Sequence, residues 1–134
     1  MKKINSICII DDDRITVYGI RKFLGLVVDC DDITSYANGN LAFEGIQEKY
    51  TATAKVPDII FLDINMPIMD GWQFLKEFIA LPLQQTVRIN IVTSSIDIFD
   101  RQNYEHYKNK TGHIISYNNK PIRKQLIEEI TKPA

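Results

Sequence analysis

Residues 59–71 read IIFLDINMPIMDG, and the rest of the chain is organised around this stretch. Its first four residues are large and apolar, which is typical of a strand buried on both faces. The run ends at a carboxylate, Asp63. In open α/β sheets, sites form beyond the carboxyl ends of the strands. The stretch therefore predicts an acidic site at the end of a central strand, on a loop interrupted by Pro67 and by Asp70 and Gly71.

Length and composition indicate one globular domain over residues 1–134. Of the 134 residues, 45% are hydrophobic and 25% are charged, and the formal net charge is −1. This charge balance gives no electrostatic reason to expect binding to nucleic acid or to a membrane. The apolar run near the N-terminus is too short for a signal peptide or a membrane span, so we expect a cytoplasmic protein. Cys8 and Cys30 fit neither a disulfide framework nor a zinc site.

Apolar periodicity alternates between strand and helix along the chain. Short apolar runs typical of strands are each followed by a segment with apolar residues at helical spacing. The expected strands cover residues 4–10, 33–37, 58–62, 87–92 and 114–117. The expected helices cover residues 15–24, 41–50, 72–80, 97–107 and 121–130, with a loop at residues 51–57. Pro121 is expected to open the last helix.

Five such units predict an α/β fold with a doubly wound, five-stranded parallel sheet and five helices. Parallel strands need crossover connections, and these connections are right-handed. The loops that leave the strand ends then open at one edge of the sheet. The polar residues expected to converge at that edge are Asp11, Asp12, Asp63, Thr93 and Lys120.

The converging side chains favour a magnesium-dependent phosphoryl site. Carboxylates held close together repel, and a hard divalent cation with oxygen ligands is the usual compensation. Mg²⁺ suits a partial cage of Asp12 and Asp63, because it keeps several waters and takes only one or two carboxylates. Lys120 adds a positive charge and Thr93 adds a hydroxyl. An oxygen of Asp63 can then attack phosphorus and form an aspartyl phosphate.

These motifs occur in a specific order at the strand ends. The segments are IIDDD at residues 9–13, FLDINMP at 61–67, MDG at 69–71, VTS at 92–94 and NKP at 119–121. Together they resemble the receiver domain of two-component response regulators, of the CheY-like, single-domain kind. The resemblance covers essentially the whole chain and implies the flavodoxin-like strand order 2-1-3-4-5. It implies a phosphorelay role without an output domain, and no enzymatic activity beyond self-phosphorylation from a donor and autodephosphorylation.

The resemblance also implies roles for residues around the metal. Asp63 would be the phosphoacceptor and a Mg²⁺ ligand. Asp12 would bind the ion directly, and Asp11 would act through a water. The backbone carbonyl of Asn65 would be a further ligand.

A switch mechanism follows from the same resemblance. Thr93 and Lys120 would bind the phosphoryl oxygens, and Tyr117 would swing inward when the Thr93 hydroxyl moves. This would alter the face made by the fourth helix, the fifth strand and the fifth helix, where we expect a downstream protein partner or a weak homodimer. The phosphoryl donor would be a histidine kinase or a histidine phosphotransfer protein.

Two departures from the family pattern have consequences. Asn118 and Asn119 stand where apolar residues are common, which predicts a more open strand end and a less rigidly placed Lys120. Asn65 and Ser95 are small polar residues at positions that border the path of hydrolytic water in this family. They predict a short phosphorylated lifetime.

The same residues fit other classes of protein less well. Phosphohydrolases of the haloacid dehalogenase kind carry their nucleophile after the first strand and a second aspartate two residues on, whereas Asn65 stands at that position here. A flavodoxin needs a Ser/Thr/Gly-rich phosphate loop, and the acidic residues 11–13 would repel a phosphate. A pseudo-receiver acting as a phosphorylation-independent interaction module stays open, although none of the expected site residues is lost.

Overall fold

Five parallel strands form the main sheet in the computed structural model, which describes residues 1–66 and 68–132. The strands are β2 (Ile7–Ile10), β4 (Ile33–Tyr36), β5 (Ile59–Leu62), β6 (Arg88–Thr93) and β7 (Ile114–Asn119). Their order across the sheet is β4-β2-β5-β6-β7, and all the pairs are parallel. Numbered along the chain as first to fifth, this is the expected order 2-1-3-4-5.

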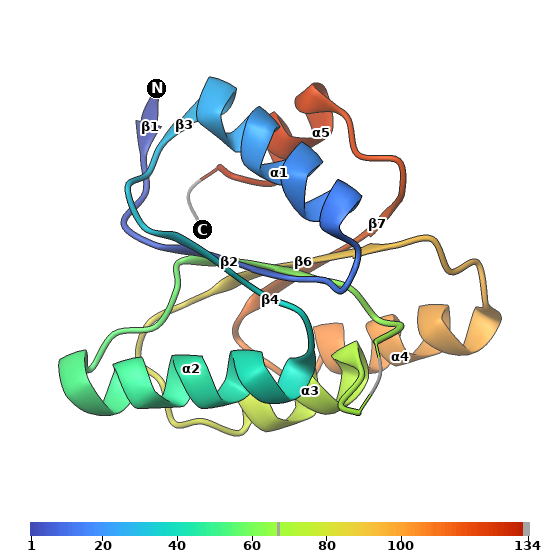
Figure 1. The fold of residues 1–134 in the computed structure, drawn as a ribbon. Coiled ribbons are helices and arrows are strands. Elements are labelled where there is room, and N and C mark those ends of the chain that lie inside the picture. The colour runs from blue at the N-terminus through green and yellow to red at the C-terminus, as the bar shows by residue number, and fades with distance from the viewer. Residues whose placement is uncertain (67, 133–134) are drawn as a thin grey trace.

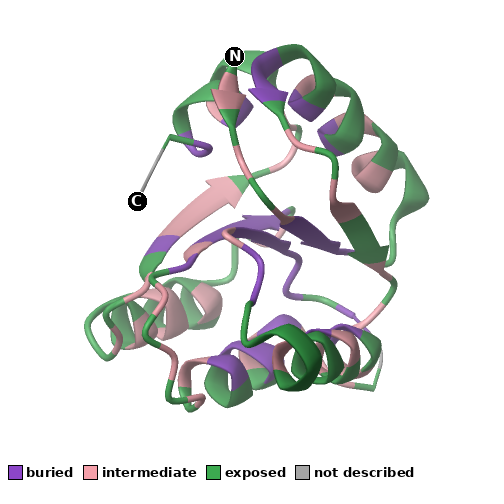
Figure 2. Cartoon of the chain, turned by 90° about the vertical axis from the view of Figure 1, so that its left-hand side faces the viewer, coloured by how far each residue is buried: buried purple, intermediate pink, exposed green. Residues whose placement is uncertain are grey.

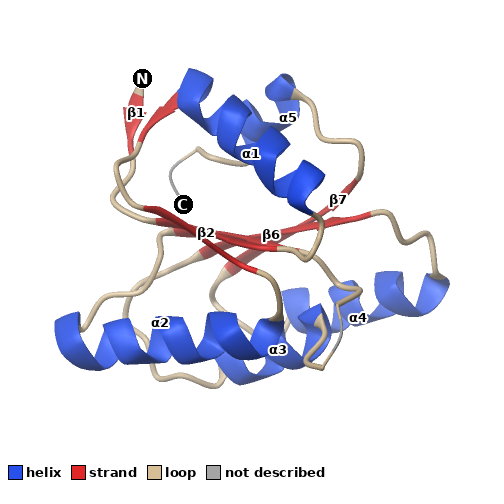
Figure 3. Ribbon diagram, in the orientation of Figure 1, coloured by secondary structure: helices blue, strands red, loops and turns tan. Residues whose placement is uncertain are grey.

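Helices cover both faces of the sheet, as Figure 1 shows. In the described part of the chain they are α1 (Arg14–Val27), α2 (Gly39–Thr53), α3 (Gly71–Ile79), α4 (Ile98–Lys108) and α5 (Lys124–Glu129). Helices α1 and α5 lie on one face, and α2, α3 and α4 lie on the other (Figure 3). The predicted doubly wound α/β fold is therefore confirmed. No helix within residues 1–66 and 68–132 has both the length and the apolarity to cross a bilayer.

The sheet separates two apolar cores, and β5 contributes to both. All four of its residues are buried, and successive side chains point to opposite faces. Ile59 and Phe61 pack with α1 and α5, whereas Ile60 and Leu62 pack with α2 and α3. Figure 2 shows the buried strands between helices whose outer faces are exposed. The next residue, Asp63, therefore leaves the strand from a fixed position in the middle of the sheet.

The N-terminal half differs from the prediction in two places. A small parallel sheet pairs β1 (Lys2–Lys3) with β3 (Val28–Asp29), so the first main strand begins at Ile7 and not at residue 4. Helix α2 continues to Thr53, so the loop predicted at residues 51–57 was wrong at its start. Within this last turn, the hydroxyls of Thr51 and Thr53 donate to helix carbonyls four residues back.

The last strand and helix also have other bounds than predicted. Pairing with β6 continues to Asn119, because the Lys120 N–H still donates to the Thr93 carbonyl at 2.9 Å. The peptide bond that follows, Lys120–Pro121, is cis. Helix α5 begins only at Lys124, so Pro121 does not open it.

Candidate functional site

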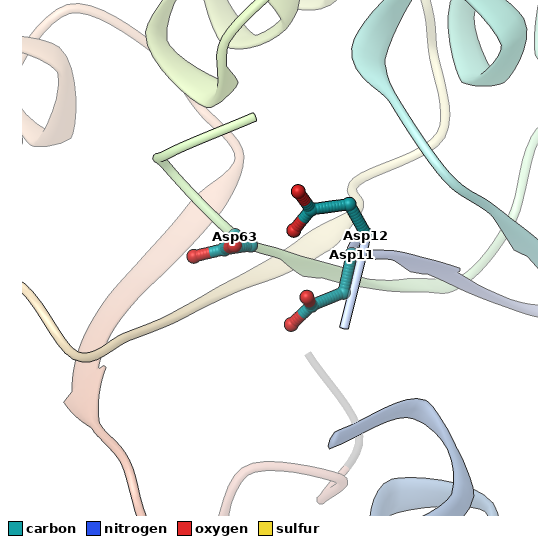
Figure 4. A group of neighbouring side chains, drawn as sticks. All are labelled: Asp11, Asp12 and Asp63. Carbon is teal, nitrogen blue, oxygen red and sulfur yellow. The ribbon is translucent and has the colours of Figure 1, made fainter. Parts of the chain in front are cut away.

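Three carboxylates meet at the ends of two neighbouring strands. Asp11 and Asp12 follow β2, and Asp63 follows β5 (Figure 4). One ligand atom from each lies within 4.8 Å of the others. The strand ladder causes this convergence: the Asp63 N–H donates to Ile10 O at 2.9 Å, and the Asp11 N–H donates to Tyr36 O at 3.0 Å. The predicted acidic cluster is confirmed.

Two of these carboxylates are electrostatically unfavourable where they lie. Asp11 and Asp63 are only 5% and 6% exposed, whereas Asp12 is exposed. Burial, and next the charge of Asp11, raise the pKa of Asp63 to about 6, against the opposing effect of Lys120. Burial also raises the pKa of Asp11, although the Asp13 N–H and Lys120 act in the opposite direction. When both carboxyls are ionised, the site therefore has an excess of negative charge that a bound cation would stabilise.

Lys120 provides the positive charge at this edge. Its Nζ lies 3.2 Å from Oδ2 of Asp11 and 4.0 Å from Oδ2 of Asp63. The lysine side chain is 18% exposed, and its backbone N–H is bonded to β6. The expected approach of Lys120 to the acidic cluster is confirmed.

The two asparagines before Lys120 hold this strand end by hydrogen bonds. The amide of Asn118 donates to Ile91 O at 3.1 Å. The amide of Asn119 donates to Ser95 O at 3.0 Å and to Thr93 O at 3.4 Å. Asn118 is partly buried and Asn119 is exposed, and both amides donate to backbone carbonyls of β6 or of the loop that follows it. The more open strand end stays a prediction.

Thr93 and Tyr117 are both hydrogen-bonded to Ser95. Thr93 ends β6 and is fully buried, and its hydroxyl accepts from the Ser95 N–H at 3.1 Å. The Tyr117 hydroxyl donates to Ser95 O at 3.3 Å. Its ring packs on α4, with 5.5 Å between the ring centroids of Tyr117 and Tyr104 and with Arg101 5.1 Å above the ring. Thr93 and Tyr117 are thus linked through one residue of the β6–α4 loop.

The loop after β5 carries a close contact that the sequence pattern does not reveal. Asn65 is exposed two residues after Asp63, and Pro67 lies outside the described residues. A Cβ on Gly71 would lie 2.3 Å from the Asp63 carbonyl oxygen and 2.8 Å from Ile64 Cα. The pattern indicates only a turn at Gly71. The structure shows that the start of α3 packs directly against the backbone of Asp63.

A second contact that the sequence pattern does not reveal joins α3 to α4. Trp72 is partly buried and is stacked on Tyr107. Its indole N–H also donates to Oδ1 of Asp100 at 2.7 Å. These residues are 28 positions apart, so periodicity within either helix cannot predict the bond.

The donor set fits a hard divalent cation. All the candidate ligand atoms of Asp11, Asp12 and Asp63 are carboxylate oxygens, and Mg²⁺ prefers oxygen ligands. Two of the three groups are buried, where an uncompensated negative charge is costly. These side chains would therefore hold the ion.

Comparison with known proteins agrees with this geometry. A family profile described as the response regulator receiver domain matches residues 7–131. The chain is 31% identical over 89 residues to sporulation initiation phosphotransferase F of Bacillus subtilis (strain 168), which covers 66% of this chain and 64% of that protein. It is 28% identical over 137 residues to hybrid signal transduction histidine kinase L of Dictyostelium discoideum, covering 98% of this chain and 7% of that protein.

The structural comparison leads to the same family. A crystal structure of a two-component response regulator from Cytophaga hutchinsonii superposes with a TM-score of 0.78 and 27% identity, over 96% of this chain and 95% of that one. The chain spans less than two thirds of the two curated relatives, 64% and 7% of their lengths. The family match nevertheless covers nearly all of this chain. The chain belongs to the family of CheY-like receiver domains of two-component response regulators, which act in phosphorylation-based signalling.

Proposed function

We propose that this receiver domain accepts a phosphoryl group on Asp63 in a Mg²⁺-dependent reaction, and that the modification switches a protein-interaction face. One observation carries the proposal. The Asp63 carboxylate is buried at a strand end, with two further carboxylates beside it and the Lys120 ammonium 4.0 Å away. This arrangement complements a phosphoryl group and a divalent cation at the same time.

Asp11, Asp12 and Asp63 would hold the ion, together with the backbone carbonyl of Asn65. Receiver domains generally bind Mg²⁺ at an acidic pocket, and the carboxylate cluster of this chain supports the same role here. When bound, Mg²⁺ supplies positive charge that offsets the charge on the phosphoryl oxygens. We assign the direct contact to Asp12 and the water-mediated one to Asp11.

The two oxygens of Asp63 have different surroundings. Oδ1 accepts a hydrogen bond from the Ile64 N–H at 2.9 Å, whereas Oδ2 faces Lys120. We therefore assign the nucleophilic role to Oδ2. The bond between Oδ2 and phosphorus forms while the P–N bond of a phosphohistidine donor breaks, and the leaving imidazole keeps the electron pair and takes up a proton. Lys120 then lies next to the new phosphoryl oxygens.

The proposed switch uses the β6–α4 loop. A phosphoryl group adds about two negative charges at neutral pH, which favours movement of the Thr93 hydroxyl and of Lys120 toward it. Tyr117 shares Ser95 with Thr93, so it would respond to that movement. The affected face comprises α4, β7 and α5, and the start of α4 exposes Ile98 and Phe99 there. A downstream protein or a second copy of the chain would bind this face.

The expected partners follow from the family. Receiver domains interact with histidine kinases or phosphotransfer proteins. We propose that this chain takes its phosphoryl group from such a protein in the cytoplasm and is monomeric or weakly dimeric. Its chemistry would be limited to gaining and losing its own phosphoryl group.

Water access supports a short phosphorylated lifetime. Asn65 is exposed, and the Ser95 hydroxyl donates to Asp100 on α4. Neither side chain is large or apolar enough to exclude water from Asp63. A time course of dephosphorylation after donor removal tests this, and persistence for many hours would contradict it.

The deciding experiment is intact mass spectrometry after incubation with acetyl phosphate. The wild type should gain one phosphoryl group when Mg²⁺ is present and none when the metal is chelated. Asp63→Asn should gain none, whereas the exposed Asp31→Asn should behave as wild type. An adduct that persists in Asp63→Asn would contradict the assignment. No adduct and no Mg²⁺ binding would favour a phosphorylation-independent interaction module.

A further inference from the structure

Ser95 is the point where the proposed phosphoryl site meets α4. Its N–H donates to the Thr93 hydroxyl, its carbonyl accepts from Tyr117 and Asn119, and its hydroxyl donates to Oδ2 of Asp100. Because Thr93 accepts from Ser95, the Thr93 hydroxyl proton stays available for another acceptor such as a phosphoryl oxygen. A displacement of Ser95 would therefore change the hydrogen bonds of both Thr93 and Asp100.

Asp100 extends this series of hydrogen bonds to α3. Its second oxygen, Oδ1, accepts from the indole N–H of Trp72 at 2.7 Å. One carboxylate thus joins the β6–α4 loop to the first turn of α3, and its own position is in α4. Both bonds are to an ionised acceptor, the strong class of hydrogen bond in proteins.

Helix α4 has little else to fix its position. None of the 11 described residues of α4 is buried. Its apolar attachment consists mainly of partly buried aromatic rings, Tyr107 on Trp72 and Tyr104 on Tyr117. A helix with few buried apolar contacts belongs to the least stable part of a fold, and a few polar bonds then decide where it lies.

We propose that Asp100 is a positioning residue that ties the β6–α4 loop and α4 to Trp72, so that a movement of Thr93 reaches α3 and α4 through Ser95 and Asp100. The inference rests on the proposed phosphorylation of Asp63, because that event supplies the movement. It assigns to Asp100 and Trp72 a part in the switch beyond packing.

The test uses Trp72, the single tryptophan of the chain, as a fluorescent reporter. Beryllium fluoride with Mg²⁺ serves as the phosphoryl mimic, and ¹⁹F NMR reports whether it binds. Asp100→Ala removes both bonds, and Asp100→Asn keeps an acceptor for Trp72 and a polar partner for Ser95. Glu105→Ala is the matched control, because it removes an exposed carboxylate from the same helix. Circular dichroism checks that every variant is folded.

Wild type, Glu105→Ala and Asp100→Asn should show a change in Trp72 emission when the mimic binds. Asp100→Ala should bind the mimic while its emission change falls at least about fivefold. In the absence of the mimic, the amides of α4 should exchange about tenfold faster in Asp100→Ala than in Glu105→Ala, as expected for loss of a charged hydrogen bond. An emission response in Asp100→Ala equal to that of wild type, or equal α4 exchange in the two alanine variants, would overturn the inference.

The two proposals can fail separately. If the wild type does not bind the mimic, the proposed phosphorylation fails, and the exchange comparison alone decides whether Asp100 positions α4. If the mimic binds and Trp72 does not respond in the wild type, Asp63 keeps its role and the coupling through Asp100 is refuted.

Discussion

The Lys120 ammonium lies 4.0 Å from Oδ2 of Asp63, across the ends of β7 and β5. It is the nearby positive charge that opposes the raised pKa of this carboxyl. In the proposed phosphorylated state the same ammonium faces the phosphoryl oxygens. The same ammonium therefore favours the ionised form of Asp63 in the unphosphorylated site and would stabilise the phosphoryl group after the proposed reaction.

Replacing Lys120 by alanine should slow phosphorylation by acetyl phosphate about a hundredfold, the usual effect of removing one preorganised positive or donor group from a reacting centre. Initial rates from intact mass measure this. Lys124→Ala, which removes an exposed lysine at the start of α5, should react at the wild-type rate. Equal rates in the two variants would show that Lys120 has no part in the reaction.

Gly71→Ala should destabilise the protein by about 1 to 3 kcal/mol, the range typical of overpacked sites. The added Cβ would lie 2.3 Å from the Asp63 carbonyl oxygen, so the backbone at Asp63 must shift. Denaturant unfolding measures the change, and phosphorylation should slow as well.

Gly19→Ala is the control for this substitution. Gly19 lies in α1, and an added Cβ would meet nothing within 4 Å. It should raise the free energy of unfolding by about 0.5 to 1 kcal/mol, because alanine is the better helix former. If both variants have wild-type stability, the close contact at Gly71 does not limit the fold.

The fold and the acidic cluster could be predicted because both follow from topology. A buried apolar run locates the strand, its last residue locates Asp63, and parallel pairing brings Asp63 beside Asp11 whatever the side-chain conformations are. The same argument places Lys120 at this edge. Information of this kind is local in the sequence and needs no knowledge of packing.

The contacts that the prediction missed depend on how separate elements pack. The bond from Trp72 to Asp100 requires the relative placement of α3 and α4, and the contact of Gly71 with Asp63 requires the path of a loop. The pairing of Lys2 with Val28 joins strands of two residues, which are too short for a periodic pattern. Hydrophobic periodicity carries none of this information.

His113 should make stability depend on pH. Its Nδ1 accepts from the Val87 N–H at 3.0 Å, and its ring packs on Phe78. Burial lowers the pKa of His113 below its ordinary value, so the unfolded chain binds a proton more readily than the folded one. The stabilisation is complete above pH 6.5, the ordinary value, and is lost as pH falls toward the folded pKa.

The variant His113→Asn isolates this effect, because an amide oxygen can accept from Val87 without titrating. Urea unfolding between pH 5 and 8 should show a steeper loss of stability below about pH 6.5 in the wild type than in His113→Asn. His106→Asn removes an exposed imidazole and should keep the wild-type profile. Parallel profiles for wild type and His113→Asn would refute the prediction.

Asp63 should change stability with pH in the direction opposite to His113. Mg²⁺ should reverse the destabilisation that the ionised Asp63 carboxylate causes. A carboxyl whose folded pKa is raised to about 6 binds its proton more tightly in the folded state, so the unfolding free energy falls as pH rises from about 4 to about 6. Above pH 6 the carboxyl is ionised in both states, and the folded protein is destabilised by the full amount. Without metal, Asp63→Asn should therefore be more stable than wild type at pH 8, by up to about 3 kcal/mol, and the difference should shrink toward pH 4. Thermal unfolding with a chelator present measures it.

Adding Mg²⁺ should raise the melting temperature of the wild type at pH 8, because the ion binds the ionised carboxylates and offsets their repulsion. The increment should decline below about pH 6, where a proton on Asp63 competes with the ion. Asp63→Asn should respond weakly at every pH, and the exposed Asp31→Asn should follow the wild type. A Mg²⁺ increment as large at pH 5 as at pH 8 would mean that the ion binds elsewhere, since binding at this cluster requires Asp63 to be ionised.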